Sequence, residues 1–219
     1  MISFINRHKI LLAKIIIITG YGISIPGLWI MRHNPQAFQL SWIFTTLSLV
    51  ILLVFHNPYT VKFTLTILAV GIIGWVVEAI GTSTGIIFGG YTYGPSLGPK
   101  LLDTPIVMLI NWMISTYLVI MVLKPIFINV WRLALVGASL MVLYDILLEP
   151  IAIRLFMWNW ETGTPPLQNY IAWFIVSFPL VFLLSRQTKD TSNPLAIMLF
   201  TCQMIFFAIL NVLIGFYNM

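Results

Sequence analysis

The chain has 219 residues, of which 60% are apolar and 8% are charged, and its mean hydropathy is +1.00. These values lie far outside the range of soluble globular domains, so that class is excluded. A single cysteine, Cys202, excludes a disulfide framework and a cysteine-based metal site. The net charge of +5 is explained by basic residues that anchor cytoplasmic loops, so it does not indicate a nucleic-acid partner.

Apolar runs that are long enough, or nearly so, to cross about 30 Å of hydrocarbon follow one another along the chain. Seven such runs predict an all-α polytopic integral membrane protein with a single membrane domain over residues 1–219. The predicted spans are residues 10–30, 40–55, 61–80, 105–123, 131–151, 167–184 and 195–216. The first resembles a signal-peptide start, but no small-x-small cleavage pattern follows it, so we interpret it as retained. The second is short and ends at Asn57-Pro58, which leaves a tight hairpin with the third as an alternative.

The distribution of lysine and arginine predicts the orientation, because cytoplasmic loops carry an excess of these residues. If the N-terminus is cytoplasmic and all seven spans cross, the inner side holds Arg7, Lys9, Lys14, Lys62, Lys124, Arg132, Arg186 and Lys189. The outer side then holds only Arg32, Lys100 and Arg154. We therefore expect a multi-pass protein of the plasma membrane with its C-terminus outside. The same topology brings five of the six acids to the outer face, namely Glu78, Asp103, Asp145, Glu149 and Glu161.

The first outer loop, residues 81–104, contains six glycines and two prolines that forbid a continuous helix. Its aromatic residues oppose disorder, so we expect an ordered loop, for which a re-entrant path is one option. Irregular backbone at membrane depth is tolerated where it packs in protein or lines a wet cavity, so this loop is predicted to roof a pocket. The alternative is a glycine-rich surface connection in which Tyr91 and Tyr93 are ordinary interfacial residues.

The second outer loop, residues 150–166, carries Trp158 and Trp160. Such a pair often anchors a protein at the membrane interface, but aromatic faces beside buried acids also suit a cationic intermediate. The order of elements repeats loosely, although the match is too weak to indicate a duplication. In each copy of the repeat, a span that ends near a glutamate is followed by a loop with an aromatic-x-aromatic motif and then by a span that contains asparagine and tryptophan. These last residues are Asn111–Trp112 in the first copy and Asn169 and Trp173 in the second.

Asp145 and Glu149 are four residues apart, so a helix places them on one face. Two neighbouring carboxylates in an apolar setting cannot both ionise cheaply, and a protonated acid beside an ionised one forms an acid/base pair. The alternatives are that Arg154 or Lys100 neutralises them, or that they cap the backbone amides of the next loop. Glu78 has no cation nearby in sequence, so it is predicted either to bind loop backbone or to complete a catalytic site.

Other chemistries find little support in the sequence. The three histidines are scattered, so neither a histidine metal site nor a Ser-His-Asp arrangement is expected. No lysine follows Lys189, which excludes the retinal Schiff base of other seven-span proteins. A Mg²⁺-dependent prenyl transferase would need aspartate-rich diphosphate sites, for which the segment Asp145–Glu149 is a poor substitute. No metal and no cofactor is expected.

Several motifs between about residues 65 and 180 resemble, in joint order, those of the membrane carotenoid hydratase family. They are Glu78-Ala-Ile-Gly-Thr-x-Thr-Gly-x-x-Phe-Gly-x-Tyr-x-Tyr, Leu97-Gly-Pro-Lys-Leu, Pro105 followed by Asn111–Trp112, Tyr144-Asp-Ile-Leu-Leu-Glu-Pro150-x-Ala, Trp158-Asn-Trp160 and Asn169-Tyr-Ile-Ala-Trp173. The chain departs from the family at Asp103, where an apolar residue is usual. The resemblance implies water addition to the terminal 1,2 double bond of a long acyclic carotenoid in the bilayer, giving a tertiary alcohol without a redox cofactor.

Protonation of such an alkene gives a tertiary cation, so the enzyme needs a strong acid, an aromatic-lined pocket and a base that orients water. We expect Asp145 or Glu149 to be the acid, and Glu78 or the other member of the pair to position water. The candidate substrate-binding residues are Tyr91, Tyr93, Trp112, Tyr144, Trp158, Trp160, Asn169 and Trp173. The alternatives are another carotenoid or isoprenoid enzyme, such as a cyclase, and a non-catalytic transport or binding protein in which the acids relay protons.

Overall fold

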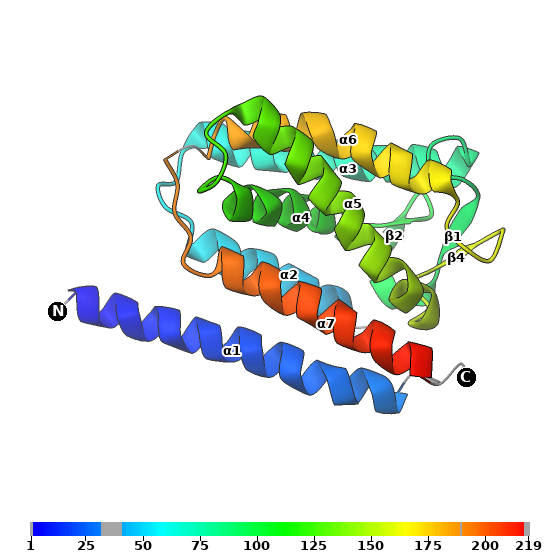
Figure 1. Ribbon diagram of the computed structural model, residues 1–219, viewed down its shortest axis with the longest axis horizontal. Coiled ribbons are helices and arrows are strands. Elements are labelled where there is room, and N and C mark those ends of the chain that lie inside the picture. Colours follow the sequence, from blue (N-terminus) through cyan, green and yellow to red (C-terminus); the bar gives the residue numbers. More distant parts are fainter. Residues whose placement is uncertain (1, 32–40, 189, 217–219) are drawn as a thin grey trace.

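The computed structural model describes residues 2–31, 41–188 and 190–216, which form seven α-helices arranged side by side (Figure 1). They are α1 (Ile2–Met31), α2 (Ser41–Val54), α3 (Val61–Thr84), α4 (Val107–Leu123), α5 (Val130–Arg154), α6 (Leu167–Ser185) and α7 (Ala196–Phe216). Five of them, α1, α3, α5, α6 and α7, are long and apolar enough to cross a membrane, whereas α2 and α4 are shorter apolar helices. The predicted all-α polytopic membrane fold is confirmed.

The two helices that carry the buried acids have well-defined ends. Thr60 caps the start of α3, where its hydroxyl accepts a hydrogen bond from the Phe63 amide at 3.1 Å. Gly85 ends α3 in the left-handed conformation that glycine adopts without strain. Asn129 caps α5 by accepting from the two amides of Trp131 and Arg132. Both helices extend a few residues beyond the predicted spans, so their acids lie within the last ten residues.

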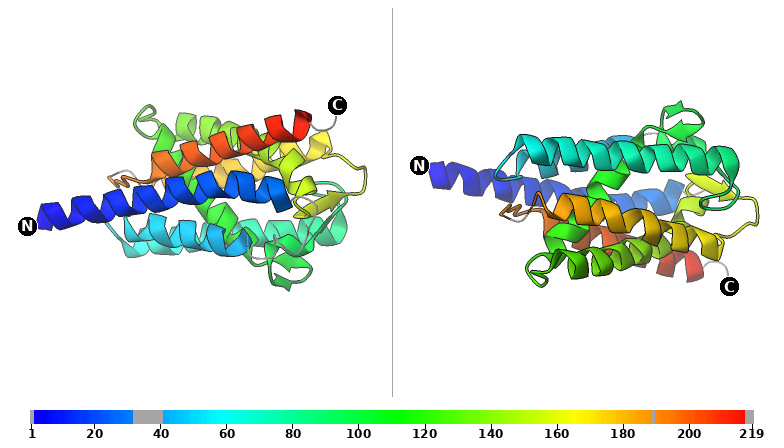
Figure 2. Two further views of the ribbon diagram at one scale, coloured as in Figure 1. Left: turned by 90° about the horizontal axis from the view of Figure 1, so that it is seen from below. Right: turned by 90° about the horizontal axis from the view of Figure 1, so that it is seen from above.

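Helix α4 lies at the centre of the bundle, where it contacts α2, α3, α5, α6 and α7 (Figures 1 and 2). Its residues are mostly buried, and Trp112 and Tyr117 are among the largest fully buried side chains of the described chain. Helix α1 packs along α7 at the edge of the bundle, where the rings of Tyr21 and Phe206 meet edge to face. A helix as apolar as α4 is therefore shielded by protein, while much of α1 faces outward.

The two loops at residues 81–104 and 150–166 are joined by short strands that the sequence did not predict. Strand β1 (Tyr91–Tyr93) pairs antiparallel with β4 (Trp158–Trp160), and Thr92 faces Asn159 at the middle of the register. In both strands the outer two residues are buried and the middle one is exposed. The first loop also contains a 3-10 turn, Pro95–Leu97, and the pair β2 (Lys100–Leu101) and β3 (Thr104–Pro105). The loop at residues 81–104, which was predicted to be ordered, is thus held in place by strand pairing across the end of the bundle.

The opposite end of the bundle is held by a polar cluster around His56. The His56 ring is buried, stacks on Phe63 at 3.7 Å, and has its Nδ1 2.8 Å from the Tyr117 hydroxyl. Lys124 donates to the carbonyl of Thr188 at 3.2 Å, which ties α4 to the connection between α6 and α7. Burial is the main cause that lowers the pKa of His56 below its ordinary value.

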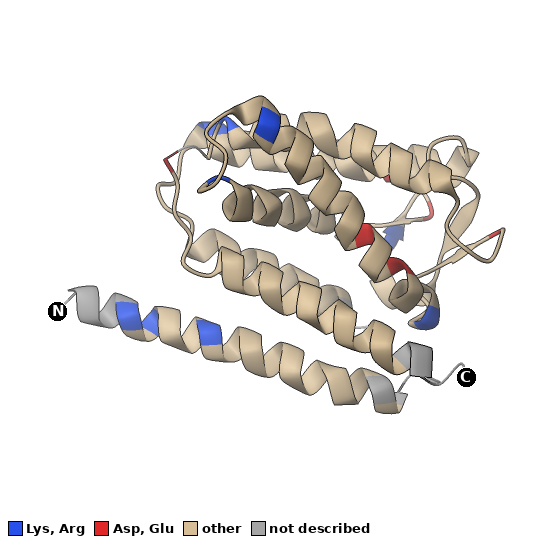
Figure 3. Cartoon of the chain, in the orientation of Figure 1, with Lys and Arg blue, Asp and Glu red and all other residues tan. Residues whose placement is uncertain are grey.

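Charged residues are divided between the two ends (Figure 3). Most of the lysines and arginines lie toward the end where α1 begins, and most of the acids lie toward the end with β1 and β4. Two basic residues of the orientation count, Arg32 and Lys189, lie outside the described residues.

Candidate active site

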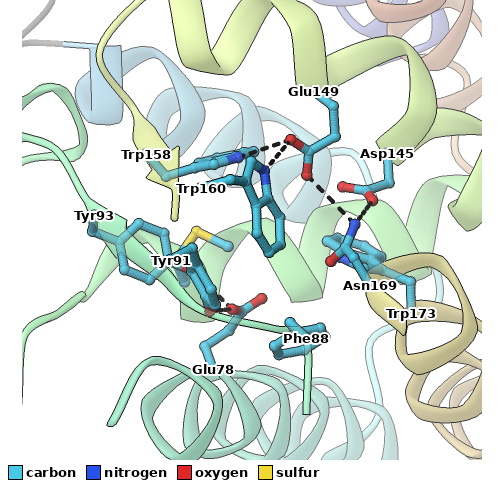
Figure 4. Close-up of a pocket in the computed structure, with 11 residues that line it drawn as sticks. Glu78, Phe88, Tyr91, Tyr93, Asp145, Glu149, Trp158, Trp160, Asn169 and Trp173 are labelled. Atoms are coloured by element: carbon cyan, nitrogen blue, oxygen red, sulfur yellow. Dashed lines mark hydrogen bonds between the residues drawn. The ribbon is translucent and has the colours of Figure 1, made fainter. Parts of the chain in front are cut away.

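Three carboxylates from two helices share one cavity beneath the strand pair (Figure 4). Its volume is about 20 Å³, which is room for a single water molecule. The lining residues come from α3, α4, α5, α6, both strands and the loop before β1, and they are Glu78, Phe88, Tyr91, Tyr93, Met108, Asp145, Glu149, Trp158, Trp160, Asn169 and Trp173. The fold therefore gathers acids that are up to 71 residues apart in sequence around one aromatic-walled space.

Glu78 on α3 is buried and accepts three hydrogen bonds. The hydroxyls of Tyr91 and Tyr93 donate to its Oε2 at 2.7 and 2.8 Å, and the Trp112 indole N–H donates to its Oε1 at 3.2 Å. Burial, together with the charge of Glu78, raises the pKa of both tyrosines above the ordinary value. Their hydroxyls therefore stay protonated and act as donors, which suits an ionised Glu78.

Glu149 on α5 accepts a similar set of donors from the second loop. The indole N–H groups of Trp158 and Trp160 donate to its Oε2 at 3.0 and 2.8 Å. The Asn169 side-chain amide reaches its Oε1 at 3.5 Å. Because an indole N–H can only donate, these partners favour the ionised carboxylate.

Asp145, one turn before Glu149, has a different environment. It is 1% exposed, and the Asn169 side-chain amide donates to its Oδ2 at 2.7 Å. Its Oδ1 is buried without a hydrogen-bond partner among the described residues. A buried carboxylate oxygen without a partner is costly, so this atom is well placed to carry or to transfer a proton.

The cavity is strongly acidic, because its described lining contains three acids and no lysine, arginine or histidine. Lys100, which could have neutralised them, instead donates to the main-chain carbonyl of Tyr93. Arg154 is exposed at the end of α5. A space lined by acids and aromatic faces is suited to stabilise positive charge that develops during a reaction.

Two tryptophans, one on α4 and one on α6, stack on each other at the site. Trp112 of α4 stacks on Trp173 of α6 with ring centroids 4.6 Å apart and an interplanar angle of 17°. Trp112 can lie against α3 because residue 74 is glycine, where a Cβ atom would be 2.2 Å from the indole ring. Gly74 therefore permits the close approach that lets Trp112 reach Glu78.

The structure brings together most of the residues singled out in the sequence. Two of them do not line the cavity: Trp112 contacts the site through its hydrogen bond to Glu78, and the Tyr144 ring packs edge to face on Phe207 of α7. Adjacent helix positions point about 100° apart, so a neighbour of Asp145 faces a different part of the bundle. Phe88 and Met108 were not predicted, although Met108 precedes Trp112 by one helical turn, and that spacing could have indicated it.

Comparison with known proteins identifies the family of this chain. A family described as carotenoid biosynthesis protein matches residues 35–219, so the chain belongs to that family. It is 30% identical over 128 residues to a protein of Haloarcula japonica named bisanhydrobacterioruberin hydratase. That match spans 54% of this chain and 43% of the relative. No solved structure matches the chain significantly.

Proposed function

We propose that this chain is a carotenoid hydratase that adds water across the terminal 1,2 double bond of an acyclic carotenoid end group. Family membership and the name of the relative support a hydratase role in carotenoid biosynthesis. The observation that carries the proposal is the meeting of Glu78, Asp145 and Glu149 in one aromatic-walled cavity with room for a water molecule. The proposed reaction needs only a proton donor, a proton acceptor and water. The carboxyl groups supply the first two, and no cofactor is required.

The proposed reaction balances with the groups present. A carboxylic acid of the Asp145–Glu149 pair gives its proton to the less substituted alkene carbon, and the π electrons form the new C–H bond. The resulting tertiary cation is stabilised by the nearby carboxylates and aromatic faces. Water then forms the C–O bond and loses a proton to an ionised carboxylate, Glu149 or Glu78. Return of that proton to the acid restores the site, and the product is a tertiary alcohol.

The proposed setting is the plasma membrane, with the N-terminus cytoplasmic and the cavity toward the outer leaflet. The uneven distribution of basic residues between the two ends supports this orientation (Figure 3). A long carotenoid would lie within the bilayer, and its end would reach the acids from the membrane under the strand pair. The seven helices would then act as seven crossings, of which α2 and α4 are the shortest.

The proposal is tested by expression in a host that accumulates lycopene, followed by mass analysis of the pigments. The expected product is lycopene with the mass of one water added. Asp145→Asn, Glu149→Gln and Glu78→Gln should each suppress it, whereas Asp190→Asn, which changes an exposed acid at the far end, should not. An isomer of unchanged mass would indicate a cyclase, and proton flux without any pigment change would indicate a transporter. Hydration by all three site variants would show that the acids do not form the active site.

A further inference from the structure

Two helix–strand–helix units are related to one another across the strand pair. The first is α3–β1–α4 and the second is α5–β4–α6 (Figure 1). In each unit a glutamate lies near the end of the first helix. One of its carboxyl oxygens accepts two hydrogen bonds, and the donors are the two inward-facing aromatic residues of the strand in the same unit. Each second helix places a tryptophan seven residues after a proline, and these two tryptophans stack on one another. The loose repeat in the sequence thus corresponds to a two-fold arrangement around the cavity.

The two units differ at the cavity in two corresponding positions. One turn before the glutamate, α5 carries Asp145, which lines the cavity, where α3 carries Gly74, against which the Trp112 indole packs. Three residues after the proline, α6 carries Asn169 where α4 carries Met108, and both of these line the cavity. Asp145 and Asn169, which have no polar counterpart in the first unit, are hydrogen-bonded to each other. The Asn169 amide donates to Asp145 Oδ2 at 2.7 Å.

This departure from the two-fold arrangement distinguishes among the three acids. Glu78 and Glu149 occupy equivalent positions, and each accepts from three N–H or O–H groups, which suits two anions. Asp145 accepts from one group only and keeps a buried oxygen, Oδ1, without a partner among the described residues. A neutral carboxylic acid has one carbonyl oxygen and one O–H, and the carbonyl oxygen is the better acceptor. Since Oδ2 accepts the N–H of Asn169, the proton belongs on Oδ1.

We propose that Asp145, through Oδ1, is the proton donor to the alkene, and that Asn169 is a positioning residue that keeps the acid proton on Oδ1. This assignment rests on the proposed hydratase function and resolves which member of the Asp145–Glu149 pair is the acid. The Oδ1–H bond breaks as the C–H bond forms, and the resulting Asp145 carboxylate keeps its bond from Asn169. Glu149 then takes the proton released by the captured water and returns it to Asp145, which lies one helical turn away and lines the same cavity (Figure 4).

The test compares Asp145→Asn, Glu149→Gln and Asn169→Leu in purified protein reconstituted in lipid, with lycopene as substrate. Asp145→Asn should lower kcat by about 10³-fold, as expected for loss of a general acid. Asn169→Leu should lower kcat by about 10²-fold, the usual effect of a misplaced reacting group, and leave KM within about threefold. It should also increase the solvent deuterium isotope effect on kcat, because proton transfer to carbon becomes slower relative to the other steps.

The matched control is Asn211→Leu, since Asn211 also donates to α5, at the Leu147 carbonyl, but does not line the cavity. Its isotope effect should equal that of the unchanged protein, even if its folded yield falls. An Asn169→Leu variant with unchanged kcat and isotope effect would overturn the positioning role. Abolition of activity by Glu149→Gln with retention in Asp145→Asn would overturn the assignment of the acid while leaving hydration itself intact. Absence of hydrated lycopene with the unchanged protein would instead refute the proposed function.

Discussion

Tyr93 of β1 lies directly opposite Trp158 of β4, yet the two side chains donate to different carboxylates, Tyr93 to Glu78 and Trp158 to Glu149. The ring centroids are 6.2 Å apart and the planes nearly perpendicular. The pairing of these two three-residue strands therefore positions the hydrogen-bond donors to Glu78 and to Glu149 together. Because side chains alternate along a strand, a slip of one residue would turn all of these donors away from the cavity.

Replacing Tyr93 with phenylalanine removes one of the three donors to Glu78. A hydrogen bond to a charged group contributes about 1.5–3 kcal/mol, so Tyr93→Phe should lower the rate of hydration by about tenfold to a hundredfold. The pKa of Tyr93 is raised well above its ordinary value by burial and by Glu78, so the loss should be the same at pH 6 and pH 9. Initial rates at the two pH values measure this. Tyr59→Phe, at an exposed tyrosine of the opposite end, should match the unchanged protein.

Adding a single methyl group at Gly74 should disturb the site through Trp112. The new Cβ would be 2.2 Å from the indole, so the ring must move away from Glu78 and from its stack on Trp173. Gly74→Ala should destabilise the fold by about 1–3 kcal/mol, the usual cost of overpacking, and reduce hydration. Thermal unfolding in detergent, followed by tryptophan fluorescence, measures the first effect. Gly20→Ala, on α1 where a Cβ meets nothing within 4 Å, should unfold at the same temperature or slightly higher.

Stability should fall in mild acid because of His56. Its pKa is lowered in the folded state, mainly by burial, so the unfolded chain binds more protons between that value and the ordinary value of 6.5. The stabilisation from neutral His56 is therefore complete above about pH 6.5 and declines as the pH drops toward the folded-state pKa. Unfolding temperatures at pH 5 and pH 8 measure the loss. His56→Asn should flatten this dependence, and a slope unchanged in that variant would assign the loss to other groups.

Two exposed positions at opposite ends of the bundle can test the orientation. In a Cys202→Ser background, Asn159→Cys should react with an impermeant thiol reagent added outside intact cells. Ser192→Cys should react only after the membrane is opened. Ser96, although in an outer loop, cannot report on this because it is fully buried and donates to the Leu155 carbonyl. The reverse pattern of labelling would place the cavity on the cytoplasmic side.

The sequence predicted the helices well where hydropathy alone determines them. The sixth span was expected over residues 167–184, and α6 covers Leu167–Ser185. Two expected crossings, α2 and α4, proved shorter than a full span, with 14 and 17 residues. The ends of α3 and α5 were placed four and three residues too early. The polar residues of Gly81–Thr84 lower the hydropathy at the end of α3, and Pro150 favoured an earlier end of α5, although the helix continues through it.

The contacts within the site were much less predictable. Asp145 and Glu149 were expected on one face from helical spacing, whereas their proximity to Glu78 depends on tertiary packing. The β1–β4 pair joins three-residue strands that are 67 positions apart, too short for a recognisable alternation. Asn169 was expected to contact the substrate and it lines the cavity. Its hydrogen bonds to the two carboxyl groups depend on how α6 packs against α5, which the sequence does not reveal.

The volume of the cavity has a consequence for the order of products. The space suits one water, while the branched tip of an isoprenoid chain is several times larger, so the rings around it must separate each time a tip is admitted. If the proposed function holds, one molecule of the protein can process only one extremity of a pigment per encounter. A pigment with two identical extremities must be released, reversed and captured again. Early in a time course, the singly hydroxylated species should therefore exceed the doubly hydroxylated one.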